Sequence, residues 1–526
     1  MSSSPSPTSY PNKESRDTFE PIPRNSPWRD WLALGLLMFP VLLVAVDNTA
    51  LTFALPAIAR SLETTGVQLL WIVDAYPLVL AALLVAMGSL GDRIGRRRLL
   101  LIGSIGFAAV SAATAFAPSA EWLIAGRAGL GFFGAMLMPS TLSLIRNIFP
   151  DANRRRLAIA IWAAGFSGGA ALGPIFGGWL VEHFWWGAIL LVAVPIMLPL
   201  LILGQFFIPE SRDPLPGKID LPSIALSMLV MVPVVYGIKE IATQGFTPAA
   251  LGIVGVGLIM GAVFVRRQKA LATPLLDMGL FTNRVFSTGI AANVLAIFSF
   301  NGFIFFLAQH LQLLEGMSPS ASGIAMIPAL LATVVAGLVV VPLVRVVPPG
   351  YVVAGGLALS AAGYALVAFG DHSAGPALLL AALLVLALGV GAAETISNDL
   401  ILGSVPPAKS GAAAAISETG YEVGSLLGTA ILGSILTASY QRNLVFPDGV
   451  AGAIPDGASH RAGETLAGAV ELADSLPGPA ATQLLENARN AFDSGVHITA
   501  TIALVLVGLT AIVAGVVLRG VPRATK

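Results

Sequence analysis

The sequence predicts an all-α integral membrane protein, and three features lead to that prediction. Apolar residues make up 56% of the 526 residues and charged residues only 11%, with a mean hydropathy of +0.83. Apolar runs of about 20 residues, the length of a membrane-spanning helix, follow one another along almost the whole chain. Lys and Arg are shared unequally between the connections. Because soluble proteins average about 25% charged residues, this composition excludes a soluble enzyme, a nucleic-acid-binding protein and a disordered protein.

Fourteen membrane spans are expected after a polar N-terminal tail. Residues 1–30 are rich in Ser, Pro and charge and are expected to be disordered, and their acidic residues argue against a signal peptide. The expected spans are 32–54, 68–90, 99–117, 122–148, 157–181, 186–208, 220–238, 248–265, 286–310, 319–343, 350–369, 376–403, 411–438 and 496–518.

The positions of Lys and Arg give the expected orientation. With the N-terminus inside, 23 of the 29 Lys and Arg residues fall in the tail and the inner connections, and five, Lys239 among them, fall outside. Arg127 lies within a span. The positive-inside rule therefore places both termini in the cytoplasm. One helix more or fewer would reverse every later connection and spoil this split.

The connection between the last two spans, 439–495, is much longer than the others. Its segments 460–476 and 479–493 have helical apolar spacing and are separated by Pro and Gly residues at 477–479. A helical hairpin resting on the outer membrane face fits this pattern. A solvated, disordered loop is the alternative.

A charged, glycine-containing motif occupies the short inner connection between the second and third spans. It reads Gly88-Ser-Leu-Gly-Asp92-Arg93-Ile-Gly95-Arg96-Arg-Arg-Leu-Leu. Glycine allows a tight turn and close helix approach. A carboxylate can hold arginines or helix N-terminal amides in a contact that breaks and re-forms. The motif resembles the GxLaDrxGrkxxL signature of the major facilitator superfamily, with one glycine in place of the usual alanine.

Two further segments resemble motifs of the same superfamily. Arg127 in the fourth span must face a partner or water, because a charge is costly inside a membrane. The corresponding arginine of the family is tied to proton coupling. The fifth span matches the family's antiporter motif GxxxGPxxGG, a face of small residues with a proline kink, and this resemblance implies export by exchange. The matching positions are Gly169, Gly173, Pro174, Gly177 and Gly178.

The number of spans, the run Trp71-Ile-Val-Asp74-Ala-Tyr76 and the long last loop resemble the fourteen-helix drug/proton antiporter branch. The resemblance extends from about residue 30 to the end and is strongest to exporters of quaternary ammonium compounds and intercalating dyes. It implies the major facilitator fold, with two six-helix bundles and two inserted helices. The expected domains are the tail 1–30, an N-terminal bundle 31–210, the inserted helices with linkers 211–285, and a C-terminal bundle 286–526 that includes the loop 439–495.

Acidic residues within the spans are the expected coupling and substrate sites. Desolvation favours the protonated form of a carboxyl group and a nearby cation favours the ionised form, so one site can hold either a proton or a cationic drug. Asp47 and Asp74 coincide with family aspartates in the first and second spans. Glu418 and Glu422 lie one helical turn apart, at positions where the family has acids, and are expected to titrate as a coupled pair.

Glu394 is expected to be an additional acid of this chain, with Asn398 one turn further along. The aspartate that family exporters of multivalent drugs can carry in the tenth span is absent, and Thr333 lies near its place. Asp399 is expected to be structural. For each acid the alternative is a structural hydrogen bond to a neighbouring helix. Aromatic rings could stack on flat cations, although ordinary packing would also explain them. The candidates are Phe300, Phe303, Tyr421 and Trp162.

The expected function is secondary active efflux of lipophilic cations, among them quaternary ammonium compounds, intercalating dyes and fluoroquinolones, in exchange for protons. The sequence has no nucleotide-binding motif, so an ion gradient is the expected energy source. The acids would also suit sodium, and protons follow from the resemblance. Export of a lipid or an endogenous metabolite is the alternative, and a membrane-embedded enzyme or receptor is a more distant one. With no Cys and five scattered His, we expect no cofactor, no metal and no catalytic residue. The expected partners are the cations, protons and the lipid bilayer, without nucleic acid, for a monomer in the bacterial cytoplasmic membrane.

Overall fold

The computed structural model describes residues 27–521 apart from 213–219, 272–273, 275, 371–374, 406–409 and 447–455. Within these residues the chain is helical and contains no β-strand. Most of the expected tail and part of the loop 439–495 lie outside the described residues.

Helices occupy all fourteen predicted spans. The first six are α1 (Pro27–Leu62), α2 (Gly66–Ile94), α3 (Arg96–Thr114), α4 (Ala120–Ile148), α5 (Ala152–His183), and α6 (Ala188–Leu191) with α7 (Ala193–Phe207). The inserted helices are α8 (Leu221–Gln244) and α9 (Pro248–Ala270). The remaining spans are α10 (Arg284–Gln309), α11 (Pro319–Leu343), α12 (Pro349–Phe369), α13 (Pro376–Gly403), the run α14 (Ser410–Leu427), η5 (Gly428–Gly433) and α15 (Ser434–Asn443), and α18 (Gly478–Val517).

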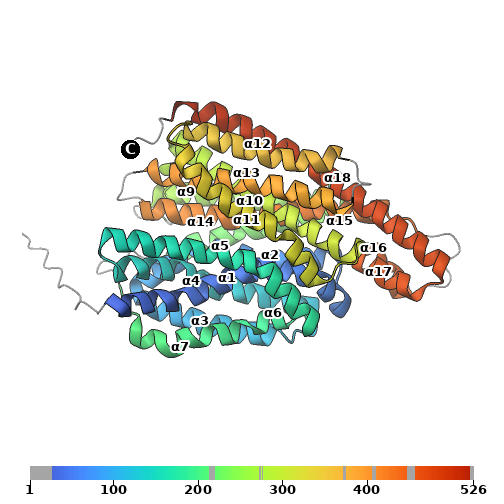
Figure 1. Cartoon of the computed structure of the whole chain (residues 1–526), viewed down its shortest axis with the longest axis horizontal. Helices are drawn as coiled ribbons and strands as arrows, with labels where there is room; N and C mark the ends of the chain where they lie inside the picture. The colour runs from blue at the N-terminus through green and yellow to red at the C-terminus, as the bar shows by residue number, and fades with distance from the viewer. Residues whose placement is uncertain are drawn as a thin grey trace, which may run out of the picture.

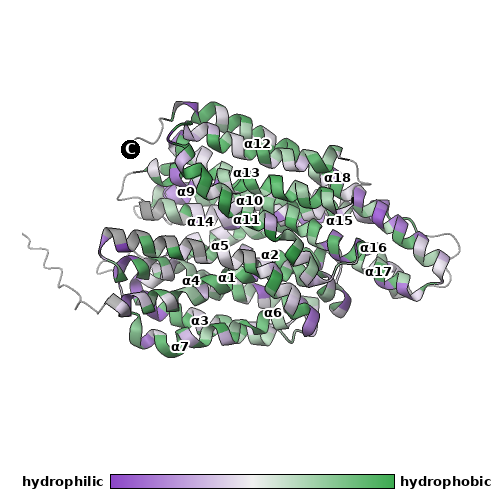
Figure 2. Ribbon diagram, in the orientation of Figure 1, coloured by the Kyte–Doolittle hydropathy of each residue, from purple (hydrophilic) through white to green (hydrophobic). Residues whose placement is uncertain are grey.

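Thirteen helical segments of the described chain are long and apolar enough to cross a membrane. α5 occupies the remaining predicted span. Figure 2 shows hydrophobic residues along the length of the bundle and hydrophilic residues concentrated toward its ends. The all-α membrane fold class expected from the sequence is therefore confirmed, and the helices are consistent with the expected fourteen spans.

The helices form two bundles that lie against each other. Figure 1 shows the first bundle, blue to green, below the second bundle, yellow to red. In the first bundle α1 packs on α5 and α2 on α4, and in the second α12 packs on α13 and α18. The two bundles meet where α5 contacts α11 and where α2 contacts α14. We call the end that carries Arg96 and the C-terminus the basic end and the opposite end the hairpin end.

Local sequence sets many of the helix ends. Thr65 begins α2 with a capping box, in which its side chain accepts a bond from the Gln68 amide and the Gln68 side chain accepts one from Thr65. Gly95 separates α2 from α3 with φ +112°, and Gly245 ends α8 with φ +80°. Both values lie in the region that glycine adopts without strain, which explains two of the sharp turns between spans.

The long loop before the last span is helical where the structure describes it, and it differs from the expectation in two ways. α16 (Asp456–Glu464) and α17 (Leu466–Ser475) cover the first predicted segment, but the second segment is no separate helix. It is the first part of α18, which runs without a break for 40 residues. Figure 1 shows α17 and this part of α18 extending beyond the ends of the other helices rather than lying across them. A continuous helix keeps its backbone hydrogen bonds, whereas a break after Asp493 would expose them.

The end of α8 was also placed wrongly from the sequence. The expected span stopped at residue 238 because Lys239 and Glu240 follow it, and Lys239 was counted as an outer-loop cation. The helix continues to Gln244, and the Lys239 side chain is 1% exposed. The lysine is therefore part of the helix bundle, where it has a charged partner.

Candidate functional site

Arg127 forms a buried ion pair with Asp47. The helix α4 places Arg127 against α1, and its Nη1 atom lies 2.6 Å from Asp47 Oδ2, with both side chains at most 5% exposed. Its Nε donates to the carbonyl of Ile72 at 3.2 Å, and its guanidinium lies 4.6 Å from the Tyr76 ring centroid. Two neighbouring helices, α1 and α2, thus hold the arginine of α4, which has a carboxylate, a carbonyl and an aromatic face as partners.

Arg127 also borders a small cavity between the two bundles. The cavity measures about 30 Å³, which is room for a water molecule. Polar residues line it from both sides: Thr49 and Thr52 of α1, and Asn301, Ser425 and Thr429 of α10, α14 and η5. The Asp47–Arg127 pair therefore lies at the surface where the two bundles must move apart if they move.

Three acids of the second bundle form a cluster, which we call the acidic cluster: Glu394 of α13 with Glu418 and Glu422 of α14. Glu418 interacts electrostatically with both of the others, and all three act on Tyr421. Glu422 is 6% exposed, and its Oε2 atom has no hydrogen-bond partner among the described residues. Carboxylates gathered in this way, with few donors near them, can accept protons or a cation.

Aromatic residues of the first bundle face this cluster. The Phe166 ring centroid on α5 lies 6.0 Å from that of Tyr421, and the Trp162 ring is stacked on Phe166 at 6.3 Å. The indole nitrogen of Trp162 donates to Thr141 of α4 at 3.2 Å. Acids from one bundle and aromatic faces from the other therefore meet across the interface.

The other predicted aromatic positions lie elsewhere. Phe303 is fully buried in the second bundle, where its ring packs on Tyr364 at 5.5 Å and on Phe306 at 4.6 Å. This is core packing on the inner side of α10, so the structure gives no support to Phe303 as a cation contact. Phe300 is partly buried and packs against the same core.

The side chain of Asn398 is hydrogen-bonded to Ser417 rather than to Glu394, the acid one turn before it. Its side-chain oxygen accepts a hydrogen bond from Ser417 at 2.6 Å, and Asn293 of α10 reaches the same hydroxyl at 3.4 Å. These bonds join α10, α13 and α14 beside Glu418. Asp399 is exposed, and Thr333 bonds back to its own helix at Ala329.

Asp74 does not join the acidic cluster. It is completely buried on α2, and its Oδ2 atom lies 3.0 Å from Nζ of Lys239 on α8. In the sequence this lysine resembles a loop residue, because a charge at the end of an apolar run usually marks the start of a loop. The signal in the sequence that could have placed Lys239 inside the helix is the helical pattern that continues to Gly245.

The charged motif lies in the turn at the basic end. Asp92 and Arg96 form an ion pair at 2.8 Å, and Arg96 also donates to Ser211. Glu210, which sequence analysis did not single out, accepts from the amide of Arg97 at 3.0 Å and caps α3. A Cβ atom on Gly95 would come within 2.7 Å of the Glu210 carboxylate. The Glu210 side chain could move aside, so it is the φ of +112° that favours glycine at this turn. Arg93, at the same turn, is exposed.

The glycines of the antiporter motif lie on two sides of α5. A Cβ atom on Gly169 would lie 2.8 Å from Ala45 of α1, and one on Gly177 would lie 2.7 Å from Ala50. Gly173, between them, faces Thr49 of α1. On the other side, Gly178 approaches the carbonyl of Pro319 on α11.

Pro174, within the same motif, takes part in a second close approach between the bundles. Its carbonyl faces Gly323 of α11. Backbone thus meets backbone between the two bundles toward the hairpin end, which only residues without side chains allow. The structure shows that end closed by direct helix contact.

Two opposed helical bundles, with a buried arginine–carboxylate pair and a cluster of acids at their interface, define a polytopic membrane transporter. The chain belongs to the Major Facilitator Superfamily, whose family model matches residues 37–429.

Curated relatives cover nearly the whole chain. The multidrug efflux pump LfrA of Mycolicibacterium smegmatis is 54% identical over 499 residues, which are 95% of this chain and 98% of that protein. The methyl viologen resistance protein SmvA of Salmonella typhimurium is 36% identical, over 88% and 93% of the two chains. The tetracenomycin C resistance and export protein of Streptomyces glaucescens is 32% identical, over 94% and 91%.

Solved structures share the fold. A bacterial homolog of the human lysosomal transporter Spinster, in an inward-facing and unoccupied conformation, aligns with a TM-score of 0.65 at 18% identity, covering 95% of this chain and 100% of that one. A peptide transporter, POT, in complex with sulfate aligns with a TM-score of 0.61 at 16% identity, over 94% and 96%.

Proposed function

We propose that the chain exports lipophilic cationic drugs in exchange for protons, across a bacterial cytoplasmic membrane with both termini inside. The relatives described above are drug efflux and resistance proteins, which supports drug export as the function. Quaternary ammonium compounds, intercalating dyes and fluoroquinolones are the proposed cargo classes.

The meeting of acids and aromatic rings between the bundles is the observation that carries the cargo class. A lipophilic cation must replace its hydration with a carboxylate and an apolar, polarisable surface. Glu418 and Tyr421 from α14, with Phe166 from α5, provide both within one interface. A neutral lipid or a small hydrophilic metabolite would gain little from this combination.

Exchange follows from the fact that one carboxylate cannot hold a proton and a cation together. With its acids ionised, the protein binds cationic cargo, and with its acids protonated it releases that cargo. If the protein changed conformation while the acidic cluster was ionised and held no cargo, unpaired charges would be buried between the bundles, which is costly. The cycle therefore alternates between cargo-bound and proton-bound states, and this makes transport an exchange.

Asp47 and Arg127 provide a second place for a proton. An ionised Asp47 would hold Arg127, and the 2.6 Å contact between the two side chains supports this role. Protonation of Asp47 would weaken that contact and free the guanidinium toward the adjoining cavity. The pair thus links the protonation of α1 to the interface between the bundles.

Dye efflux from vesicles under imposed gradients tests the proposal. The purified protein is reconstituted into liposomes loaded with ethidium, and efflux is followed under a pH gradient, a sodium gradient or neither. We expect uphill efflux with the pH gradient alone, and none in protein-free vesicles. Efflux that survives collapse of the pH gradient but stops without sodium would overturn the proton assignment. No uphill movement of any cationic dye under either gradient would overturn the export function.

A further inference from the structure

The ion pair between Asp74 and Lys239 joins the first bundle to the inserted helix α8, and the proposed exchange does not depend on this contact. Asp74 belongs to α2 of the first bundle and Lys239 to the inserted helix α8. Their charged atoms are 3.0 Å apart, and the side chains are 0% and 1% exposed. The Lys239 ammonium also lies 3.8 Å from the ring centroid of Trp71, one turn before Asp74.

Asp74 therefore already holds a cation, and that cation is part of the protein. Asp74 and Lys239 act on each other electrostatically. A carboxylate beside an aromatic ring is a favourable binding environment for a lipophilic cation. In this structure Lys239 occupies that place, so Asp74 differs from Glu418 and Glu422 in having a cation of the protein as its partner.

A second polar contact fastens α8 to the same helix. The hydroxyl of Ser227 lies 3.2 Å from the carbonyl of Ala82 on α2, three turns away from Lys239 along α8, and it shares its single hydrogen with the Ile224 carbonyl of its own helix at 2.7 Å. α8 thus has polar contacts with the first bundle at two levels, of which the ion pair is the stronger.

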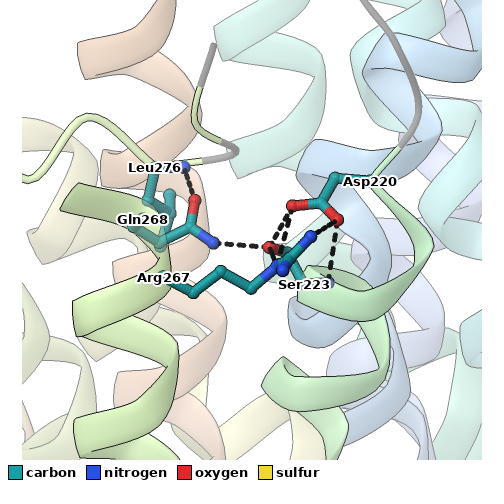
Figure 3. A network of polar contacts seen from close by, with 5 residues as sticks. All are labelled: Asp220, Ser223, Arg267, Gln268 and Leu276. Atoms are coloured by element: carbon teal, nitrogen blue, oxygen red, sulfur yellow. Dashed lines mark hydrogen bonds and ion pairs between the residues drawn. The ribbon is translucent and has the colours of Figure 1, made fainter. Parts of the chain in front are cut away.

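α9 is bonded to α8 in turn, by the network that Figure 3 shows near the basic end. Arg267 of α9 lies 2.7 Å from Asp220, which begins α8. Gln268 donates to Ser223 at 2.7 Å and accepts from the amide of Leu276 at 3.1 Å. Because these bonds cross between the two inserted helices, α8 and α9 form one unit.

The contact of this unit with the second bundle is of another kind. Near the hairpin end, Ile238, Ile241 and Phe246 lie beside Ile431 and Ile435, and these residues line an open, mostly apolar groove of about 380 Å³. Four polar residues of α15 also line this groove. Apolar surfaces can slide past each other without losing a directed bond, whereas a buried ion pair cannot separate without leaving two unpaired charges.

We propose that Lys239 is the fixed counter-ion of Asp74 and that this pair fastens α8 and α9 to the first bundle, with which they move during transport. Asp74 then carries neither the exchanged proton nor the cargo. The proposal rests on alternation of the two bundles, but not on the identity of the cargo or of the coupling ion.

Paired neutral substitutions test the counter-ion role. Met is the replacement for Lys239 because it is unbranched, apolar and of similar length. Asp74→Asn and Lys239→Met each leave one buried charge unpaired, so we expect each to lower the melting temperature. The double variant removes both charges, so we expect it to melt close to the wild type and to keep uphill dye efflux within about threefold. Lys269→Met, at an exposed lysine of α9, is the matched control.

Two results would overturn the counter-ion role. One is a double variant that is folded but moves no dye uphill, since Asp74 would then be a carrier. The other is a Lys239→Met single variant as stable as Lys269→Met, since the ion pair would then contribute nothing to stability.

Distances between spin labels test the common movement. The chain has no cysteine, so pairs of introduced cysteines can be labelled without background. Gly35 of α1, Gly255 of α9 and Gly403 of α13 each have open space where a side chain would begin. The Gly35→Cys/Gly403→Cys pair reports the two bundles, and the conditions compared are those of pH and ethidium under which its distance changes.

Under those conditions we expect the Gly35→Cys/Gly255→Cys distance to stay constant and the Gly255→Cys/Gly403→Cys distance to change. The opposite result would place the inserted helices with the second bundle and overturn the proposal. A cross-bundle distance that never changes would overturn alternation itself, while the melting temperatures would still decide whether Lys239 is the counter-ion.

Discussion

At the scale of single residues, Arg127 is bound from two sides at once. Asp47 on α1 holds one nitrogen and the Ile72 carbonyl on α2 accepts from another. A planar guanidinium can serve both acceptors with a fixed geometry, which a lysine cannot. The contacts of Arg127 thus depend on the relative position of α1, α2 and α4 as well as on the charge of Asp47.

We expect Arg127→Ala to lose uphill efflux and to lose about 3–5 kcal/mol of stability, since it leaves the Asp47 carboxylate buried without a partner. Asp47→Asn in the same chain removes the second charge, so the double variant should recover stability but not transport. Melting temperature and dye efflux measured together separate the two effects. Recovery of uphill efflux in the double variant would show that the pair is only structural.

The acidic cluster predicts a graded response among its three members. Glu418 is the member of the cluster that interacts electrostatically with each of the other two, Glu394 and Glu422. We therefore expect Glu418→Gln to impair efflux of every cationic cargo. Glu394→Gln and Glu422→Gln should impair a subset, mainly large or doubly charged compounds. A resistance and efflux panel of monovalent and divalent cations measures this, and a wild-type profile for Glu418→Gln would contradict it.

At the scale of helices, close backbone contact between α5 and α11 depends on glycine. A Cβ atom on Gly178 would lie 2.5 Å from the Pro319 carbonyl, whereas one on Gly168 would meet open space. Backbone atoms cannot rotate aside as a side chain can, so the helices themselves must separate.

We expect Gly178→Ala to depopulate the conformation in which the hairpin end is closed, and Gly168→Ala to leave it unchanged. Cysteines replacing exposed Phe116 and Gly463 place spin labels on the two bundles at that end. The distance between them should shift to longer values in Gly178→Ala. Identical distance distributions in both variants would show that the contact at Gly178 does not control closure.

The α8–α9 unit should weaken in acid at one identifiable residue. Hydrogen bonds from Arg267, and then from Ser223, hold the pKa of Asp220 below its ordinary value of 3.8. A depressed carboxyl pKa contributes stability above that ordinary value and loses it as the pH falls through the lower, folded value.

Asp220→Asn should therefore cost about 1 kcal/mol at neutral pH, because a pair this close to water is partly screened. It should also remove a part of the stability loss seen below about pH 4. Thermal melting between pH 3 and 7 measures both, with Asp399→Asn at an exposed acid as the control. A melting curve with the same acid dependence in Asp220→Asn and the wild type would refute the assignment.

At the scale of the whole molecule, the hairpin end is closed by contacts of unequal strength. Glu63, at the end of α1, pairs with Arg461 of α16 at 3.1 Å, and Arg461 also lies 3.9 Å from Glu471 within the hairpin itself. The first pair crosses between the bundles and the second does not. Both are partly exposed, so each should contribute little beside the backbone contacts of α5 and α11.

We expect Glu63→Gln to change the rate of dye efflux by no more than about fivefold, the effect of roughly 1 kcal/mol. Glu471→Gln should leave the rate unchanged, because its pair does not separate when the bundles move apart. Initial efflux rates in liposomes measure both variants. Complete loss of efflux in Glu63→Gln would show that the ionic contact, rather than helix packing, holds that end closed.

Local signals in the sequence are enough to predict the fold class, the approximate positions of the spans and several of the residues at the interface. Runs of apolar residues, Gly95 at a tight turn and Arg127 within a span are local signals, and their meaning does not depend on which helices become neighbours. Asp47 and Arg127 could each be identified as candidates in this way. That they bind each other followed only from the packing of α1 against α4.

Helix packing in the folded molecule sets which charges are partners and which aromatic rings face the interface. Lys239 has the same sequence surroundings as a lysine at the start of a loop, and only the position of α2 beside α8 shows that Asp74 neutralises it. Phe303 and Phe166 are equally plausible ring positions in an apolar helix, yet one lies in the core and the other opposite Tyr421. A helix presents side chains all around its axis, and its hydropathy cannot specify which neighbour each side meets when nearly every side is apolar. Contacts between distant segments belong to the assembled bundle, where the free energy of burying a charge depends on the partner that the fold provides.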